Sequence, residues 1–360
     1  MLTINYGKDI QKTTYETLTA SDITTYLQPQ MTVAIKPNMV LVSPPSDGAT
    51  THSEVAAGII EFLRDFGVRD IKIMESSAVG NDTKKAYKIC GFDQIGARYN
   101  VPLIDLKNAP AKTYHFAAKQ PAYELDIKIA NAPFEVDFLI NVPVLKAHCQ
   151  TRLTCCMKNL KGCIPEAEMR RYHTLGLHQP IAALATTLPV HYNVVDSICG
   201  DLSFEEGGTP VETNRIIAGR DMLTVDSFCA ELIGYRPEDI GYLKLARDNG
   251  LGKFFSPENT KVVELNADKK PSASQKSVRL SERYSRYITE NAACSVCYSA
   301  LVYGLHRLGG APRSKICIGQ GFRGKAENAV GIGDCTRNFD KFVAGCPPKA
   351  VDITEFLRKV

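Results

Sequence analysis

Apolar and polar residues follow two recurring patterns along the first 265 residues. Short apolar runs predict buried strands at 31–38, 70–76, 138–145, 193–198, 215–219 and 261–265. Apolar residues spaced by three and four positions predict helices at 53–66, 83–99 with a break near Gly91, 181–188, 221–233 and 237–249. Because strands that alternate with helices are typical of α/β proteins, the pattern predicts an α/β fold with a mainly parallel sheet flanked by helices.

The pattern changes after residue 265. Residues 266–280 are mostly polar and include proline and serine, so they predict a linker. A further helix is expected at 281–291, directly before a cysteine-rich segment. With 360 residues the chain is long enough for two units. We therefore expect an α/β domain at 1–265 and a separate C-terminal module at 281–360.

Four cysteines in the C-terminal module form a candidate metal-cluster site: Cys294, Cys297, Cys335 and Cys346. Two cysteines three positions apart can ligate one centre, and a Cys-Pro step such as Cys346-Pro347 recurs in iron–sulfur ligation. A helical apolar pattern after Cys294 places the first pair at a helix N-terminus, where the positive dipole end stabilises thiolates. Glycines at 331, 333 and 345 would let backbone approach a cluster. The set predicts a [4Fe-4S] cluster.

Other uses of these thiols remain open at this stage. Zinc also binds four thiolates, but structural zinc sites usually pair two short Cys-x-x-Cys knuckles, and here Cys335 and Cys346 are separated by ten residues. A redox Cys-x-x-Cys would not need Cys335 and Cys346. Cys317 lies in a predicted strand and is expected in the core.

Composition narrows the class of protein. The net charge of +4 is small and no basic tract is interleaved with aromatics, so nucleic acid is not an expected partner. No apolar run approaches the roughly 18 residues of a membrane span, and the N-terminus lacks the apolar core of a signal peptide. Twelve cysteines without a leader favour a reducing, cytoplasmic location, where thiols serve metals or catalysis.

The segment 143–178 concentrates candidate chemistry directly after the apolar strand 138–145. Ligands of open α/β sheets bind at the carboxyl ends of strands, so a pocket is expected here. Its possible anion-binding, acid–base and thiol groups are Lys146, His148, Lys158, Asn159, Lys161, Arg170, Arg171, His173, His178, Cys149, Cys155, Cys156 and Cys163. The four thiols could ligate a second cluster, although the adjacent pair Cys155–Cys156 strains simultaneous ligation and could simply pack as apolar residues.

Other polar residues follow the predicted strands. Lys36, Asn38 and Glu75 lie at strand ends and are candidate pocket residues. Asp226 falls among apolar neighbours in a predicted helix; if buried it needs a partner, and we expect a basic group from 146–161. The loop at 200–208 contains acidic residues (Asp201, Glu205, Glu206) that could bind a hard cation, although a solvated loop is the favoured interpretation.

Several of these stretches together resemble a known family. IKPNMV, THSEVAAGIIEFLRDFG, NVPVLKAHCQTRLT, KNLKGCIP, VVDSICGD and IIAGRDMLTVDSFCAELIGY are similar to the uncharacterised family catalogued as domain of unknown function 362 over most of residues 30–255. The most specific part is the order Lys146, His148, Thr154, Lys158, Asn159, Gly162. The resemblance implies association with iron–sulfur modules but no particular reaction. The THSE segment also resembles the nickel-dependent lactate racemase superfamily, as an analogy of fold.

These observations lead to one hypothesis and two rivals. We expect a [4Fe-4S] redox protein that transfers electrons to or from a small anionic substrate; as an enzyme it would be an iron–sulfur oxidoreductase. Lys146, Lys158 and Asn159 would orient the anion, His148 would donate a proton, and Cys149 or Cys163 would be a redox or ligand thiol. The rivals are an electron carrier that docks on a redox partner protein, and a metal-dependent isomerase or hydrolase with structural cysteines.

Overall fold

A computed structural model describes residues 1–203, 209–271 and 280–360. Its centre is an eight-stranded sheet in the order β12-β1-β11-β10-β7-β2-β3-β4. The strands are β1 (Leu2–Tyr6), β2 (Val33–Lys36), β3 (Ile71–Glu75), β4 (Leu103–Asp105), β7 (Phe138–Asn141), β10 (Tyr192–Asp201), β11 (Pro210–Gly219) and β12 (Val262–Leu265). Only β11 runs antiparallel to both of its neighbours in the described sheet, and the other pairs are parallel. The predicted α/β fold with a mainly parallel, helix-flanked sheet is confirmed.

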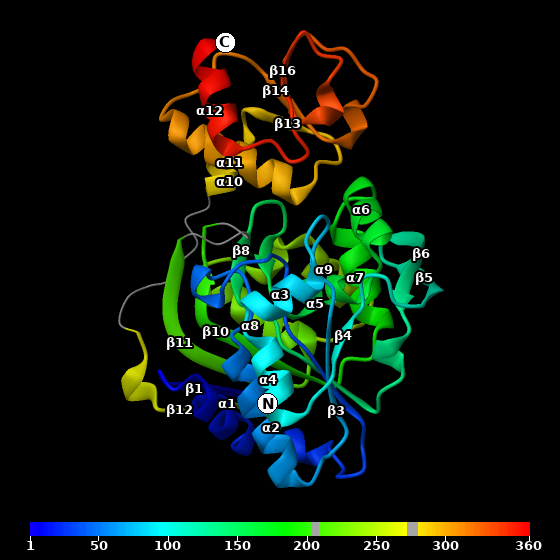
Figure 1. Cartoon of the computed structure of the whole chain (residues 1–360), viewed down its shortest axis with the longest axis vertical. Helices are drawn as coiled ribbons and strands as arrows, with labels where there is room; N and C mark the ends of the chain where they lie inside the picture. The colour runs from blue at the N-terminus through cyan, green and yellow to red at the C-terminus, as the bar shows by residue number, and fades with distance from the viewer. Residues whose placement is uncertain (204–208, 272–279) are drawn as a thin grey trace.

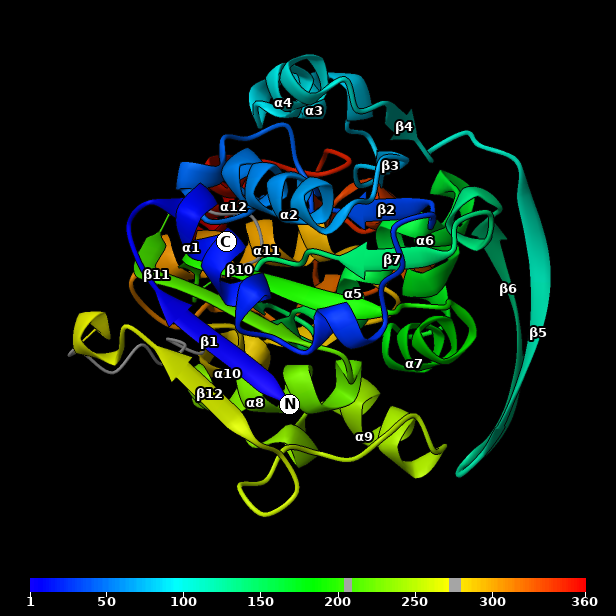
Figure 2. The same cartoon turned by 90° about the horizontal axis from the view of Figure 1, so that it is seen from below.

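Helices cover both faces of this sheet (Figure 2). One face packs against α1 (Ile10–Thr19), α2 (Ser53–Phe66) and α4 (Phe92–Tyr99), and α3 (Thr83–Ile89) precedes α4. The other packs against α5 (Cys156–Asn159), α7 (His178–Thr187), α8 (Met222–Leu232) and α9 (Gly241–Asp248). Successive strand residues point to opposite faces, so Val33 and Ile35 join the first core and Ala34 joins the second. The near-continuous apolar strands of the sequence reflect burial on both faces.

Two hairpins and the helix α6 are further elements of the chain before residue 271. The first hairpin pairs β5 (Ala111–Lys119) with β6 (Ala122–Ala130). The second pairs β8 (Lys146–His148) with β9 (Arg152–Thr154). The helix α6 (Glu166–Thr174) follows a short 3₁₀ helix, η4 (Leu160–Cys163). The predicted helix at 237–249 is in fact two pieces, the 3₁₀ turn Pro237–Asp239 and α9.

The C-terminal module, residues 280–360, lies against one end of the sheet region (Figure 1). Its four parallel strands are β13 (Ile288–Glu290), β14 (Ile316–Ile318), β15 (Val330–Ile332) and β16 (Lys341–Val343). Its helices are α10 (Leu280–Ser285), α11 (Ser295–Leu308) and α12 (Ala350–Lys359). The predicted helix at 281–291 is wrong beyond Ser285, because residues 288–290 pair with β14.

Two sequence-based expectations fall partly on residues that the structure does not describe. These are the linker at 266–280, of which 272–279 lie outside the described residues, and the acidic loop, of which Glu205 and Glu206 lie outside. Within the described residues, no helix combines the length and the apolar character that crossing a bilayer requires.

Candidate functional site

A cavity of about 380 Å³ lies where the carboxyl ends of β2 and β3 meet the C-terminal module. In open parallel sheets this edge is the usual position of a ligand site. The cavity's polar lining includes Asn38, Glu75, Ser76, Asn81, Thr154, Lys158, Asn159, Lys161, Arg170, His173 and Ser295. Its apolar lining includes Val40, Leu41, Val79, Met169, Val296 and Pro347. Three of the predicted cluster ligands, Cys294, Cys297 and Cys346, line the same space.

Burial separates the four predicted ligands from the other eight cysteines. The eight others are all buried, whereas Cys294, Cys297 and Cys335 are partly exposed and Cys346 is exposed. Cys294 is the N-cap residue of α11 and Cys297 lies in its first turn, as predicted. At that position the free N–H groups and the positive end of the helix dipole favour thiolates. The chain thus keeps accessible those thiols whose spacing predicts a cluster.

The cysteine sulfur atoms have hydrogen-bond donors beside them. Gln320 donates from Nε2 to the Sγ of Cys294 at 3.7 Å, and Arg323 donates from Nε to the Sγ of Cys335 at 3.4 Å. Burial raises the pKa of the Cys294 thiol, and the charges of Cys335 and Cys346 add to the rise while Arg170 and Arg323 oppose it. Three of the thiols therefore lie close enough to interact electrostatically. Gln320 and Arg323 were not predicted as donors, because no local pattern in the sequence links them to the cysteines.

Two glycines shape the turns that hold Cys335 and Cys346. Gly333 has φ +86° and Gly345 has φ +130°, conformations that residues with a side chain rarely adopt. Asp334 joins the two turns, since its backbone N–H donates to the Gly345 carbonyl at 3.1 Å and its Oδ1 accepts from the Gly345 N–H at 2.7 Å. Two cysteines that are distant in the sequence are thereby held on adjacent turns.

Basic side chains form one part of the cavity wall. They belong to Lys158, Lys161 and Arg170, and His173 lines the cavity with them. Arg170 also forms an ion pair with Glu166 at 2.9 Å on the exposed face of α6. Cationic side chains around a partly closed space raise the local concentration of anions. This wall can bind a small anion next to the cysteines.

A buried ion pair lies at the cavity floor, and its glutamate, Glu75, lines the cavity. Lys36 and Glu75 are the last residues of the neighbouring strands β2 and β3, and their side chains are 0% and 3% exposed. Lys36 donates to Glu75 and also, at 2.9 Å, to the carbonyl of Pro37. Burial raises the pKa of Glu75 to about 7, against the lowering effect of Lys36. The sequence predicted both residues at strand ends, but their pairing depends on β2 and β3 being neighbours in the sheet.

The residues expected to bind the anion and move protons divide into two groups. Lys158 and Asn159 line the cavity, whereas Lys146 and His148 are buried outside its lining. Lys146 donates from Nζ to the carbonyl of Ala49 at 2.7 Å. The Nδ1 of His148 accepts from the backbone N–H groups of Gln150 and Thr151, each at 3.0 Å. Lys146 and His148 therefore stabilise the β8–β9 hairpin in this structure.

The two thiols proposed for redox or ligation also lie outside the cavity lining. Cys149 packs in the core of the C-terminal module and accepts from the Ser299 hydroxyl at 3.3 Å. Cys163 is fully buried, and burial raises its pKa to about 12, which keeps the thiol protonated near neutral pH. Asn159 donates from Nδ2 to Asn141 Oδ1 at 2.8 Å, so its amide also braces the end of the sheet.

The β8–β9 hairpin fixes the N-terminal end of α11 over the cavity. Gln150 donates to Glu290 Oε1 at 2.7 Å and to the Ala293 carbonyl at 3.1 Å, and its own Oε1 accepts from the Ser295 hydroxyl at 2.7 Å. Arg152 adds an ion pair with Glu282 at 3.0 Å. These contacts surround Cys294, so the central segment positions the cysteine site as well as lining the cavity.

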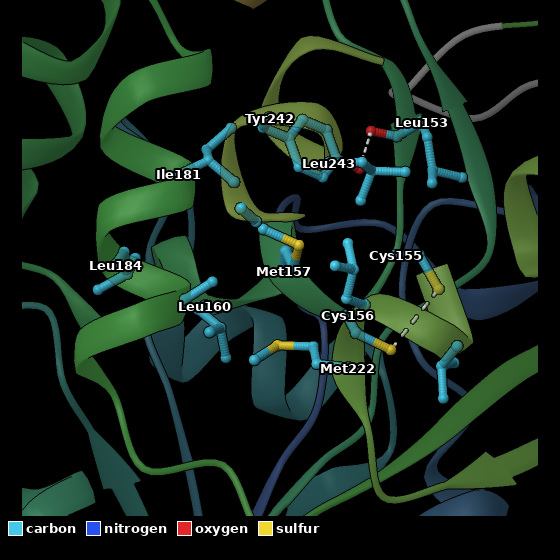
Figure 3. Packing of buried hydrophobic residues seen from close by; sticks show 14 of the residues in the cluster. Leu153, Cys155, Cys156, Met157, Leu160, Ile181, Leu184, Met222, Tyr242 and Leu243 are labelled. Atoms are coloured by element: carbon cyan, nitrogen blue, oxygen red, sulfur yellow. Dashed lines mark hydrogen bonds between the residues drawn. The ribbon is translucent and has the colours of Figure 1, made fainter. Parts of the chain in front are cut away.

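A second group of potential ligands lies deeper, formed by Cys155, Cys156 and Asp226 (Figure 3 shows the two thiols). Their sulfur and oxygen atoms lie within 4.8 Å of one another, and all three residues are fully buried. Burial raises the pKa of Asp226 to about 6 and those of both thiols well above their ordinary range.

The carboxylate of Asp226 stabilises the start of α5. Its carboxylate accepts from the backbone N–H groups of Cys156 at 2.6 Å and Met157 at 3.0 Å, at the start of α5. The expectation that a basic side chain would pair with Asp226 is therefore wrong, because the first turn of α5 supplies the donors. The protonated thiols of Cys155 and Cys156 pack among apolar side chains. This agrees with the alternative that the two cysteines pack as apolar residues.

Part of this sequence is shared with a protein family and with a known protein. Residues 33–231, just over half of the chain, match the family model described as "Domain of unknown function (DUF362)", which confirms the resemblance seen in the motifs. The thylakoid-associated protein sll1697 of Synechocystis sp. is 20% identical over 226 residues, which cover 60% of this chain and 67% of that protein.

A solved structure shows a weaker similarity. The lactate racemase apoprotein from Thermoanaerobacterium thermosaccharolyticum superimposes with a TM-score of 0.42 and 12% identity, covering 64% of this chain and 56% of the racemase. The chain thus spans little more than half of that protein's length.

Proposed function

This chain belongs to the family described as domain of unknown function DUF362, and we propose that it is an iron–sulfur redox protein that binds a small anion beside its cluster. Cys294, Cys297, Cys335 and Cys346 would hold one [4Fe-4S] cluster. When bound, such a cluster supplies one-electron transfer. The single observation that carries the proposal is that Cys294, Cys297 and Cys346 line the same cavity as Lys158, Lys161 and Arg170.

The donor set fits the proposed cluster. The four ligands are the accessible thiols among the twelve, one pair begins a helix, and the other two lie in glycine-shaped turns. Gln320 and Arg323 supply N–H groups of the kind that tune a cluster through its sulfurs.

The spacing of the thiols favours a cluster over a single zinc ion. Four sulfur atoms around one zinc ion, each at about 2.3 Å from it, lie about 4 Å apart. Among the described residues, only Cys155, Cys156 and Asp226 form a group of three with ligand atoms within 4.8 Å of one another. No three of the described C-terminal thiols meet this criterion, and a four-iron cluster does not require it because each thiolate binds a separate iron.

The cavity itself indicates what its ligand would be. Lys158, Lys161 and Arg170 would bind an anionic group, while Val40, Leu41 and Met169 offer apolar surface for the rest of the molecule. A volume of about 380 Å³ suits a small molecule. The sequence predicts that Lys146 orients the anion and that His148 donates a proton. In this proposal both residues would instead hold the hairpin that positions α11.

A non-enzymatic electron carrier is the second candidate. The exposure of Cys346 favours it, because a redox partner protein could approach the cluster there. The two functions differ in what the cavity does: a carrier has no need of an anion in it.

Replacement of Lys158 by alanine tests the anion site. We expect sulfate, used as a probe, to bind the wild-type protein and to bind Lys158→Ala at least about tenfold more weakly, because a hydrogen bond to a charged group contributes about 1.5–3 kcal/mol. Isothermal titration calorimetry on anaerobically purified protein measures both affinities. Lys244→Ala is the matched control, since Lys244 is exposed on α9 and lies outside the cavity lining.

Two results would count against the substrate-binding function. Sulfate that binds both variants equally would remove Lys158 from the site. A wild-type protein that takes up electrons from dithionite but binds no sulfate would favour the carrier.

A further inference from the structure

The Lys36–Glu75 pair lies where the cavity meets the sheet. Each residue ends a parallel strand, and because β2 and β3 are neighbours their carboxyl ends lie close enough for the two side chains to pair. Glu75 lines the cavity and Lys36 lies behind it, since Lys36 is not among the lining residues and its Nζ donates both to Glu75 and to the Pro37 carbonyl. The lysine therefore fixes a carboxyl group that faces the ligand space.

Gly162 keeps the space above this carboxyl open. A Cβ atom at this position would overlap Glu75 Oε1 and lie 2.7 Å from Lys36 Nζ. Gly162 also lines the cavity. Any side chain here would displace the carboxyl or cover it, so the close approach of backbone in η4 requires glycine. The carboxyl remains within reach of a bound molecule although it is almost completely buried.

The surroundings of Glu75 suit a group that gains and loses a proton near neutral pH. Burial is the main cause that raises its pKa to about 7; Lys36 and the Ser76 N–H lower it, and Asp105 raises it. A buried carboxyl with such a pKa beside a cavity is typical of acid–base groups. The other titratable groups around it are Tyr87 on α3, Cys163 on η4, and Lys158, Lys161, Arg170, His173, Cys294, Cys297 and Cys346 of the cavity lining.

We propose that Glu75, held by Lys36 beneath Gly162, is the proton-exchanging group of the cavity, and that it takes up a proton when a small oxyanion binds beside it. The added negative charge favours the neutral carboxyl, whose O–H can then donate to an oxygen of the ligand. The inference rests on the proposed function, because it requires that the cavity bind an anion. It adds the residue that would deliver or accept a proton on the bound molecule.

Calorimetry with sulfate tests this directly, because sulfate keeps its charge across the neutral range. Titrations at pH 7 in two buffers with different ionisation enthalpies give the number of protons taken up per sulfate bound. We expect the wild-type protein to take up a fraction of one proton at pH 7 and less at pH 5.5, where Glu75 is already protonated. Glu75→Gln should bind sulfate without proton uptake, and Glu231→Gln, which changes an exposed carboxyl on α8 outside the cavity lining, should retain the uptake.

The outcomes separate the two proposals. If the wild-type protein binds no sulfate, the anion cavity fails, and the inference fails with it. If sulfate binds the wild-type protein without proton uptake at pH 7, the role of Glu75 alone is overturned. The same follows if uptake persists in Glu75→Gln or is lost in Glu231→Gln. If Glu75→Gln does not fold, the double variant Lys36→Met/Glu75→Leu, which removes both buried charges, takes its place and should also bind sulfate without proton uptake.

Discussion

Replacement of Cys294 or Cys346 by serine is expected to reduce the iron content of anaerobically purified protein from about four atoms per chain to a small remainder. Serine keeps the size of the side chain but replaces the soft thiolate with a hydroxyl that binds iron–sulfur clusters poorly. Cys294 caps α11 and Cys346 follows Gly345, so each substitution removes one ligand from a different pair. Iron and sulfide analysis, with the broad absorbance near 400 nm, measures the effect.

The matched control is Cys317→Ala. Cys317 lies in β14 of the same module and is 2% exposed, so this substitution removes a thiol from the core and not from the cavity. We expect Cys317→Ala to retain the iron of the wild-type protein. Equal iron loss in all three variants would mean that the module depends on its thiols for folding. Wild-type protein with stoichiometric zinc and no iron would contradict the proposed cluster.

Replacement of Lys36 by methionine is expected to lower the free energy of unfolding by about 3–5 kcal/mol at pH 8, because the buried Glu75 carboxylate loses its partner. Methionine has a similar length but no charge. In the double variant Lys36→Met/Glu75→Leu both charges are absent, and replacing a buried ion pair with apolar side chains is often neutral for stability. We therefore expect the double variant to recover most of the loss. Urea unfolding monitored at several pH values measures these differences.

The pH dependence follows from the direction of the shift. The pKa of Glu75 is raised from 4.5 to about 7 in the folded protein, so its contribution to stability is fully present below pH 4.5 and is lost as the pH rises through about 7. This shift corresponds to a loss on the order of 3 kcal/mol across that window. Without Lys36 the folded pKa rises further, so the defect of Lys36→Met should be small at pH 5 and large at pH 8. The same defect at both pH values would contradict the ion pair.

Much of the fold could be predicted from local patterns. The helix expected at 53–66 is observed with those bounds, because its apolar face, its entry after a strand and the left-handed Gly67 are all encoded locally. The helix expected at 281–291 is not, because the strand at 288–290 exists only by pairing with β14, which lies more than 20 residues away in the sequence. Local patterns were unreliable where a distant partner determined the conformation.

The candidate site was likewise predictable only where local patterns in the sequence encode it. The spacing of the C-terminal cysteines and the basic residues of the central segment indicated both halves of the cavity. Which basic residues face it depends on the hairpin: Lys146 and His148 turn away from the cavity lining, whereas Lys158 and Lys161 line it. The sequence indicated Glu75 as a candidate pocket residue, but not the proton exchange proposed for it, because its pairing with Lys36 and the closeness of Gly162 arise only in the folded sheet.

The EPR spectrum of the dithionite-reduced protein, purified without oxygen and recorded with and without saturating sulfate, tests most directly whether a cluster and an anion share this cavity. We expect the signal of one reduced [4Fe-4S] cluster per chain, with g-values that shift when sulfate binds to the wild-type protein and that stay unchanged in Lys158→Ala. The absence of a cluster signal would contradict the central claim. A signal that sulfate leaves unchanged, in protein that calorimetry shows to bind sulfate, would contradict it equally.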